Sequence, residues 1–199
     1  MTHSFKSARV QRKFLERQKT ILDVAMNRLA LEGLDSVTVQ SIAQDLDLTV
    51  GALYRYYPSK SAILGALTHR TLHELREHLE ASCNTANTAI DALLNIAQAH
   101  IEFASMQQGH GLLIAQMMTT PQVVLPPEER TQAMRPAFEL IDFLEQKFIE
   151  ASEASQLHID DTRASALIFW SSIQGVMHIG KLESLDPKEL HRPNLPLRA

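Results

Sequence analysis

The sequence has few of the residues that build disulfide-linked or membrane-embedded proteins. One cysteine, Cys83, stands among 199 residues, which excludes an internal disulfide framework and favours a reducing compartment. The longest uncharged stretch near the C-terminus, residues 164–180, contains Ser171 and Gln174 and is too short and too polar to span a bilayer comfortably. Basic residues near the N-terminus are not followed by the apolar run of a signal peptide. We therefore expect a cytoplasmic protein without a membrane partner.

Positive charge is scarce overall but concentrated at the N-terminus. The net charge is -4, yet residues 1–60 hold nine Lys and Arg against six Asp and Glu, whereas residues 61–199 hold ten against seventeen. The first nineteen residues carry six basic groups and one acidic group, Glu16. Because charges more than about 8–10 Å apart are largely screened at physiological salt, an acidic remainder does not stop this segment from attracting phosphate. The alternative is that it is merely a solvated tail.

Glycine and proline are also few, and no segment alternates as a strand would. Seven Gly and eight Pro stand mostly at apparent breaks, so the intervening segments are free to be helical. We predict an all-α fold, with Gly33 as a left-handed stop after the first helix. Pro136 disfavours an uninterrupted helix, so a kinked or new helix is expected after residue 134. The expected helices cover residues 8 or 11 to 32, 39–46, 50–56, 59–81, 89–107, a short one ending near 120, 128–134, 136–153 and 160–183.

The most informative segment is residues 38–64, which places two very short helices and the start of a third in quick succession. Thr38, Thr49 and Ser59 each stand where a side-chain oxygen can accept the free amide protons of a first helical turn. Apolar residues between them recur at helical spacing, so one side of each helix turns inward. Asp47, in the turn, tolerates a left-handed backbone better than most residues. This pattern predicts a helix-turn-helix, whose second helix can enter the DNA major groove.

Residues 21–64 resemble the DNA-binding domain of the TetR family of transcriptional regulators. One departure is Asp47, where the family usually has glycine. The matching residues are Ile21, Ala25, Gly33, Thr38, Ile42, Ala43, Leu48, Gly51, Leu53, Tyr54, Tyr57, Lys60 and Leu64. The resemblance implies an all-helical homodimer, with an N-terminal three-helix DNA-binding head and a larger helical domain that binds a small molecule and dimerises. The expected divisions are a head over 1–64 preceded by a basic arm over 1–19, a regulatory and dimerisation domain over 65–185, and a loosely ordered tail over 186–199.

The resemblance also assigns residues to double-stranded DNA, although each of them singly also suits a structural role. Arg55 can donate two parallel hydrogen bonds to guanine, and Gly51 and Ala52 are small enough to let the helix approach base edges. Hydroxyl and ammonium groups suit phosphate oxygens. Leu53 and Tyr57 are expected in the core. The residues assigned to DNA are Thr38, Gln40, Thr49, Val50, Gly51, Ala52, Tyr54, Arg55, Tyr56 and Lys60.

The regulatory domain offers a weaker pattern, in which apolar bulk is combined with sparse polar groups as in a small-molecule pocket. The same residues describe a helical core equally well. The candidate ligand-binding residues are His100, Phe103, Gln107, Met117, Phe138, Trp170, Gln174 and His178. For the dimer interface, we expect the helices over 136–153 and 160–183, where Ala166, Ser171, Ser172 and Gly175 allow close packing.

No catalytic motif is evident, and we expect neither an enzyme nor a cofactor. His69, His73 and Glu77 share one helical face, but Arg70 follows the first histidine where a metalloprotease has glutamate, so a solvated polar face is favoured over a metal site. We predict a ligand-responsive transcriptional regulator, by family habit a repressor, that binds a palindromic operator as a homodimer and is released by a small molecule. The alternative is a helical ligand-binding or interaction protein that does not bind DNA. A metal-dependent enzyme is a second rival.

Overall fold

The computed structural model describes residues 2–106, 108–119 and 125–185, and all the elements within these ranges are helical, which confirms the all-α fold. None of the helices in these ranges is both long and apolar enough to cross a bilayer. The elements are α1 (Thr2–Glu32), η1 (Leu34–Ser36), α2 (Val39–Asp45), α3 (Val50–Tyr54), α4 (Lys60–Ser82), η2 (Cys83–Thr85), α5 (Ala89–Met106), α6 (Gln108–Thr119), α8 (Pro127–Glu153) and α9 (Thr162–Leu185).

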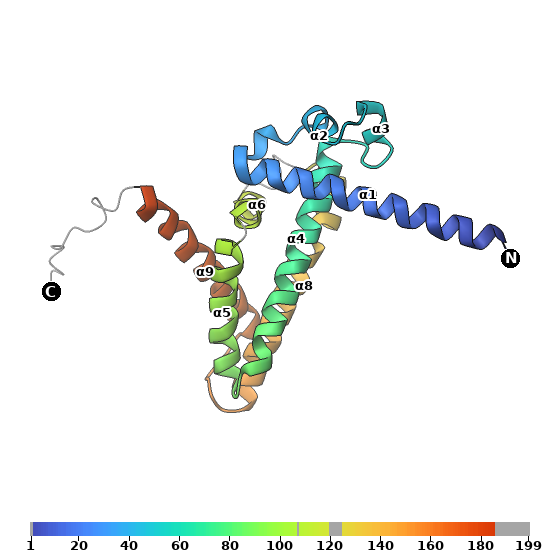
Figure 1. The fold of residues 1–199 in the computed structure, drawn as a ribbon. Coiled ribbons are helices and arrows are strands. Elements are labelled where there is room, and N and C mark those ends of the chain that lie inside the picture. The colour runs from blue at the N-terminus through green and yellow to red at the C-terminus, as the bar shows by residue number, and fades with distance from the viewer. Residues whose placement is uncertain (1, 107, 120–124, 186–199) are drawn as a thin grey trace.

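The N-terminal head consists of α1, α2, α3 and the first turns of α4 (Figure 1). Its core is built from the apolar sides of these helices and includes Ile21, Ile42 and Ile63, each with no exposed surface. Leu53 and Tyr57 also lie in this core, as expected. The short α2 and α3 cannot be stable alone, so burial against α1 and α4 holds them.

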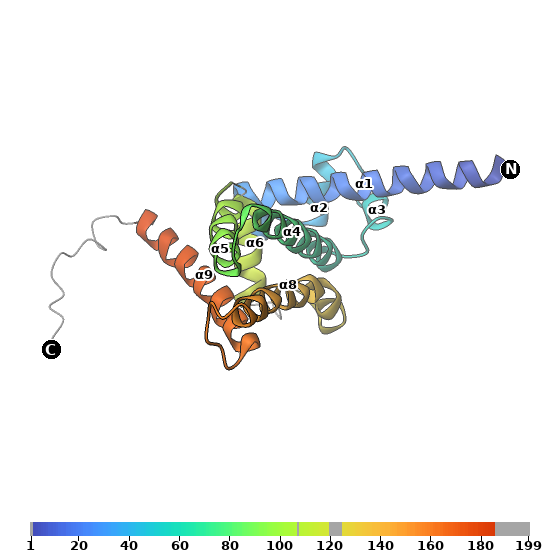
Figure 2. The ribbon, with the colours of Figure 1, turned by 90° about the horizontal axis from the view of Figure 1, so that it is seen from below.

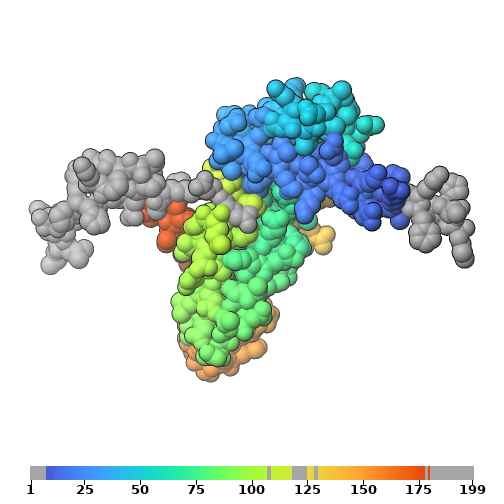
Figure 3. Space-filling model, in the orientation of Figure 1, coloured from blue at the N-terminus to red at the C-terminus, as the bar shows by residue number. Residues whose placement is uncertain are grey.

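The body is formed by α4, α5, α6, α8 and α9, and α4 joins it to the head (Figures 1 and 2). α8 packs along α4 and against α9, while α5 packs on α4 and α8. A second core, including Leu75, Ile96, Leu140 and Leu144, fills the space between these helices. The head sits on one end of the body in the space-filling view (Figure 3).

Head and body share contacts across the expected boundary at residue 64, which falls inside α4. α6 packs on α1, and Leu113 and Met117 of α6 belong to the same core cluster as the head. Leu125 and Ala133 also join that cluster. The division into domains at residue 64 stays a prediction.

The helices differ in several places from those expected from the sequence. α1 begins at Thr2, six residues before the earliest expected start, and α3 ends at Tyr54 instead of Tyr56. α8 is one helix with Pro136 inside it, so no new helix begins after residue 134, and the alternative of a kink stays a prediction. Pro136 is buried, and packing of α8 on α4 outweighs the cost of about 3 kcal/mol that proline imposes on a helix interior.

Candidate nucleic-acid interface

Side-chain caps hold the start of each helix in the helix-turn-helix. The Thr38 hydroxyl oxygen accepts a hydrogen bond from the Ser41 amide at 3.0 Å, and the Thr38 amide donates to Ser41 Oγ at 3.1 Å, which forms a reciprocal capping box. Thr49 accepts from the Ala52 amide at 3.1 Å, and Ser59 accepts from the amide of Ala62 at 3.0 Å. The three caps predicted from the sequence are therefore confirmed.

The turn between α2 and α3 is left-handed at Asp47, where φ is 51°. The Leu48 amide donates to the Ala43 carbonyl at 2.8 Å, and the Asp47 amide donates to the Gln44 carbonyl at 3.2 Å. This pair of bonds defines a Schellman motif, in which a left-handed residue ends the helix. Asp47 thus performs the role for which glycine is usual, as its tolerance of this backbone region predicted.

An exposed surface on α3 and its C-terminal end holds most residues assigned to DNA. Gln40, Thr49, Gly51, Tyr54 and Arg55 are exposed, while Val50, Ala52 and Tyr56 are half-buried. A Cβ atom placed at Gly51 would meet nothing within 4 Å, so the helix presents bare backbone there. Within the described ranges no hydrogen bond or ion pair engages the Arg55 guanidinium. The surface therefore combines close backbone approach with a free cation.

Two of the assigned residues make contacts inside the head. The Thr38 side chain serves as the cap of α2 and also donates to Ser41 Oγ at 2.9 Å. Lys60 Nζ lies 3.4 Å from the Leu34 carbonyl oxygen, a long hydrogen bond that draws this side chain towards η1. Both residues position the head, and the lysine contact is weak enough to be exchanged for a phosphate.

The arm residues Phe14 and Gln18 hold the end of α3, a role that the sequence pattern alone did not reveal. The rings of Phe14 and Tyr56 stack with centroids 4.9 Å apart, and the Gln18 amide donates to the Tyr56 carbonyl at 3.2 Å. Phe14 and Gln18 are four residues apart and extend the apolar side that begins at Ile21, which is the signal that would have found them.

An ion pair joins α1 to α2 on the outside of the head. Arg28 donates to both carboxylate oxygens of Asp45, at 2.6 and 2.8 Å. These hydrogen bonds lower the pKa of the Asp45 carboxyl and raise the pKa of the Arg28 guanidinium. The pair is exposed, so it fixes the orientation of α2 more than it adds stability.

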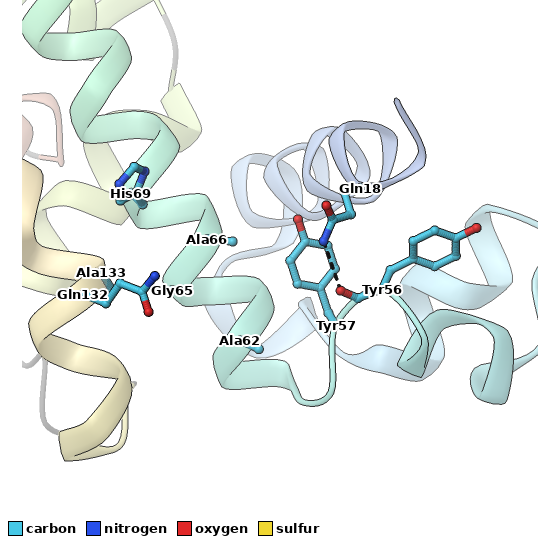
Figure 4. Close-up of a pocket in the computed structure, with 9 residues that line it drawn as sticks. All are labelled: Gln18, Tyr56, Tyr57, Ala62, Gly65, Ala66, His69, Gln132 and Ala133. Atoms are coloured by element: carbon cyan, nitrogen blue, oxygen red, sulfur yellow. Dashed lines mark hydrogen bonds between the residues drawn. The ribbon is translucent and has the colours of Figure 1, made fainter. Parts of the chain in front are cut away.

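A cleft of about 450 Å³ lies between head and body. Its floor is the small-residue side of α4 at Ala62, Gly65 and Ala66, and Tyr57 and Gln18 stand on the head side (Figure 4). Its remaining lining residues are Tyr56, His69, Gln132 and Ala133. None of the candidate ligand-binding residues lines this cleft.

Three of the candidate ligand-binding residues meet in the body. The rings of His100 and Trp170 have centroids 4.5 Å apart, and Gln174 Nε2 lies 3.4 Å from His100 Nε2. His100 is 1% exposed, and burial lowers its pKa to about 4, so the imidazole is neutral at pH 7. Within the described residues, His100 Nδ1 and Trp170 Nε1 are buried without a hydrogen-bond partner.

The other candidate ligand-binding residues do not join this trio. Phe138 is 60% exposed, and Met117 lies in the core cluster of the head, where it lines an apolar void that leaves no room for a water molecule. Phe103 is buried beside the imidazole of His110, with ring centroids 5.4 Å apart. Gln107 and the side chain of His178 fall outside the described residues.

A polar chain connects α6 of the body to α1 of the head. His110 Nε2 lies 3.1 Å from a Glu74 carboxylate oxygen, and Arg70 bridges Glu74 to Asp23, which lies 2.6 Å from Arg70 Nη1. Burial lowers the pKa of His110, and the hydrogen bond to Glu74 opposes that shift. Beside this chain α6 touches α1 so closely that a Cβ atom at Gly109 would lie 2.7 Å from Met26 Sδ.

The histidine face of α4 is divided between different surroundings. His73 Nδ1 lies 3.7 Å from a Glu77 carboxylate oxygen, whereas His69 lines the cleft between head and body. Among the described residues, no three His, Cys, Asp or Glu side chains are grouped closely enough to hold a metal ion.

A capped helix-turn-helix on a helical body defines the class of protein: a two-part, all-helical chain with a DNA-binding type of head. Residues 21–67 match the family model described as bacterial regulatory proteins, tetR family. This match covers the helix-turn-helix head, which therefore has the form of the TetR family's N-terminal domain.

One relative is similar to this chain over about half its length, and two solved structures share its fold. The chain is 37% identical over 95 residues to the nucleoid occlusion factor SlmA of Haemophilus ducreyi, a match that covers 47% of each protein. The match thus spans about half the length of that relative. A TetR-family regulatory protein from Rhodococcus RHA1 superposes with a TM-score of 0.67 at 21% identity, over 81% of this chain and 83% of that one. The regulator FadR of Bacillus subtilis, solved with stearoyl-CoA, superposes with a TM-score of 0.70 at 17% identity, over 84% of this chain and 89% of that one.

Proposed function

We propose that the protein is a ligand-responsive transcriptional repressor of the cytoplasm, which binds a palindromic operator as a homodimer. The observation that carries this proposal is the exposed surface of α3, where bare backbone at Gly51 stands beside the unpaired guanidinium of Arg55. Such a helix fits the major groove, where an arginine can donate two parallel hydrogen bonds to guanine. Tyr54, 46% exposed, and Thr49 then meet the flanking phosphates.

In this proposal the dimer forms mainly through α9, and α8 lies next to α9 at the interface. α9 exposes apolar side chains at helical spacing, of which Ile168 is 66% and Val176 60% exposed. Ser172 and Gly175 lie between them, and their small size permits close approach of a second α9. A two-fold axis through this face would set two heads about 34–36 Å apart, in successive major grooves.

The effector in this proposal binds among His100, Trp170 and Gln174. Two buried N–H groups without an acceptor favour a ligand that carries a hydrogen-bond acceptor, and a neutral imidazole favours an uncharged one. The contact of Phe103 with His110, followed by Glu74, Arg70 and Asp23, offers a physical link from this region to α1. The free energy by which an effector weakens DNA binding cannot exceed the difference between its binding free energies for the two head spacings.

DNA binding is tested by selection from randomised duplexes, followed by salt-titrated fluorescence anisotropy on the selected sequence. We expect a palindrome with half-sites about one helical turn apart and affinity that falls steeply with salt. A helical protein without DNA binding would select no sequence. The effector is then sought by thermal shift with a panel of uncharged small molecules that carry hydrogen-bond acceptors, and a hit must also release the selected duplex.

The likeness to a nucleoid occlusion factor favours a second candidate, in which the same head serves nucleoid occlusion rather than transcription. Both candidates require DNA binding, so the distinction lies in the consequences of binding. Mapping of chromosomal binding sites together with transcript levels in a deletion strain separates them. Sites whose neighbouring transcripts change on deletion support the regulator, and sites without transcript changes support the second candidate.

A further inference from the structure

The N-terminal half of α1 is a free-standing helix with a row of cations. Figures 1 and 2 both show it projecting beyond α2, α3 and α4, with no other element beside it. Residues 8–16 are exposed, whereas Ile21 is fully buried in the head. At about 1.5 Å per residue, the projecting part extends roughly 24 Å.

The cations are Arg9, Lys13 and Arg17, which recur every fourth residue and therefore lie in one row along the helix. Within the described ranges, none of the three has an ion-pair partner. Glu16, the one acidic residue of the arm, lies beside the row but pairs with Arg12 at 3.5 Å. The arm thus combines one unneutralised row with one neutralised pair.

The arm contacts the C-terminal end of α3, next to the exposed surface assigned to DNA. Phe14 stacks on Tyr56 and Gln18 hydrogen-bonds the Tyr56 carbonyl, directly after Arg55 at the end of α3. These contacts set the direction of the projecting helix relative to α3. A row step of about 6 Å is close to the roughly 6.8 Å that two nucleotides of one strand span along the duplex axis.

We propose that this row, Arg9, Lys13 and Arg17, binds the phosphates of one DNA strand outside the half-site read by α3. The inference rests on the proposed DNA binding and extends it from the major groove to the flanking duplex. The row matches the phosphates in charge and approximate spacing, and the helix that carries it passes Tyr56, next to Arg55 at the end of α3. The operator footprint is therefore longer than the helix-turn-helix requires.

The test compares two duplexes that carry the selected operator, one ending at the half-sites and one extended by about ten base pairs on each side. We expect wild-type protein to bind the extended duplex about tenfold more tightly and to protect the flanks from hydroxyl radicals. The triple variant Arg9→Gln, Lys13→Gln, Arg17→Gln should show neither effect. Its plot of log K against log salt should be shallower by about 0.9 for each phosphate that the variant no longer neutralises.

A charge-matched variant, Arg12→Gln, Lys19→Gln, Arg135→Gln, removes three cations outside the row and should behave as wild type. Equal weakening of binding in both variants would show general attraction and overturn the proposed row. Equal wild-type affinity for the two duplexes would also overturn it, while the proposed function would stand. Failure of wild type to bind the short duplex would instead count against the proposed function. Row-dependent binding to phosphatidylserine vesicles without a flanking effect would assign the arm to a membrane and reject the proposal.

Discussion

Arg55 caps the C-terminal end of α3 with its side chain exposed. Its guanidinium has no partner in the described ranges, so no protein contact must be broken before it meets a base. Tyr54 and Gly51 share that surface, whereas Leu53 between them is fully buried. One turn of helix thus has a buried side that packs in the head and an exposed side that is open to a partner.

We predict that Arg55→Ala relaxes base preference at one position of each half-site. Removal of the bidentate hydrogen bonds should cost about 1–3 kcal/mol of discrimination there and leave the fold unchanged. The measurement is a binding scan over all four bases at each operator position. An Arg76→Ala control, on the body helix α4, should keep the wild-type profile. An unaltered profile for Arg55→Ala would reject its role in base recognition.

His100 is a buried residue whose ionisation is coupled to the stability of the fold. Its folded pKa of about 4 lies below the ordinary value of 6.5 because burial disfavours the charged ring. The stability that it contributes is therefore fully present above pH 6.5 and is lost as the pH falls towards 4. At pH 4 the loss of unfolding free energy amounts to about 3 kcal/mol.

We predict that His100→Gln flattens the decline of unfolding free energy between pH 6.5 and 4. Urea denaturation at pH 6.5 and at pH 4 measures the unfolding free energy of each protein. His69→Gln is the control, because His69 is exposed. The control should follow wild type. If His100→Gln declined as steeply as wild type, His100 would not be the group that titrates.

At the scale of elements, the contact of α6 with α1 decides how body and head are joined. Gly109 is the closest point, and a Cβ atom there would lie 3.1 Å from Ala30 Cβ and 3.2 Å from the Met26 carbonyl oxygen. Since one of these atoms is backbone, rearrangement of the Met26 side chain alone cannot make room. The two helices must separate to admit a methyl group.

We predict that Gly109→Ala lowers the unfolding free energy by about 1–3 kcal/mol, despite the better helix propensity of alanine. Chemical denaturation measures the change. Gly51→Ala is the matched control, because its Cβ atom meets nothing within 4 Å, and it should stabilise the fold slightly. The same stabilising effect at Gly109 would contradict the close packing of α6 on α1.

At the scale of the whole molecule, α9 exposes a group of apolar side chains. Leu167, Ile168, Val176 and Ile179 are each about half exposed or more. Contiguous apolar side chains of this kind mark an association surface. The opposite side of α9 is buried on α8, where Ala166 and Trp170 join the body core.

We predict that Ile168→Glu converts a dimer into a monomer and abolishes operator binding, because a buried unpaired carboxylate opposes association. Sedimentation velocity and anisotropy measure the two effects. Leu94→Glu is the control, since Leu94 is 63% exposed on α5 and outside the proposed interface. It should remain a dimer. A dimeric Ile168→Glu variant would place the interface elsewhere.

The local structure of the head was determined by the sequence alone. Caps at Thr38, Thr49 and Ser59 and positive φ at Gly33 and Asp47 follow from short-range rules, because neighbouring residues supply every interaction involved. The order of helices follows for the same reason.

Only the tertiary structure decided what depends on long-range packing. Pro136 stays inside α8 because α4 packs against it, and Phe14 meets Tyr56 because α1 extends past α3. Tertiary packing also brings His100, Trp170 and Gln174 together. It leaves Phe138 exposed and places Met117 in the core of the head. Helical periodicity defines which side of a helix is apolar, but not which neighbour covers that side, and this choice separates a pocket from a core.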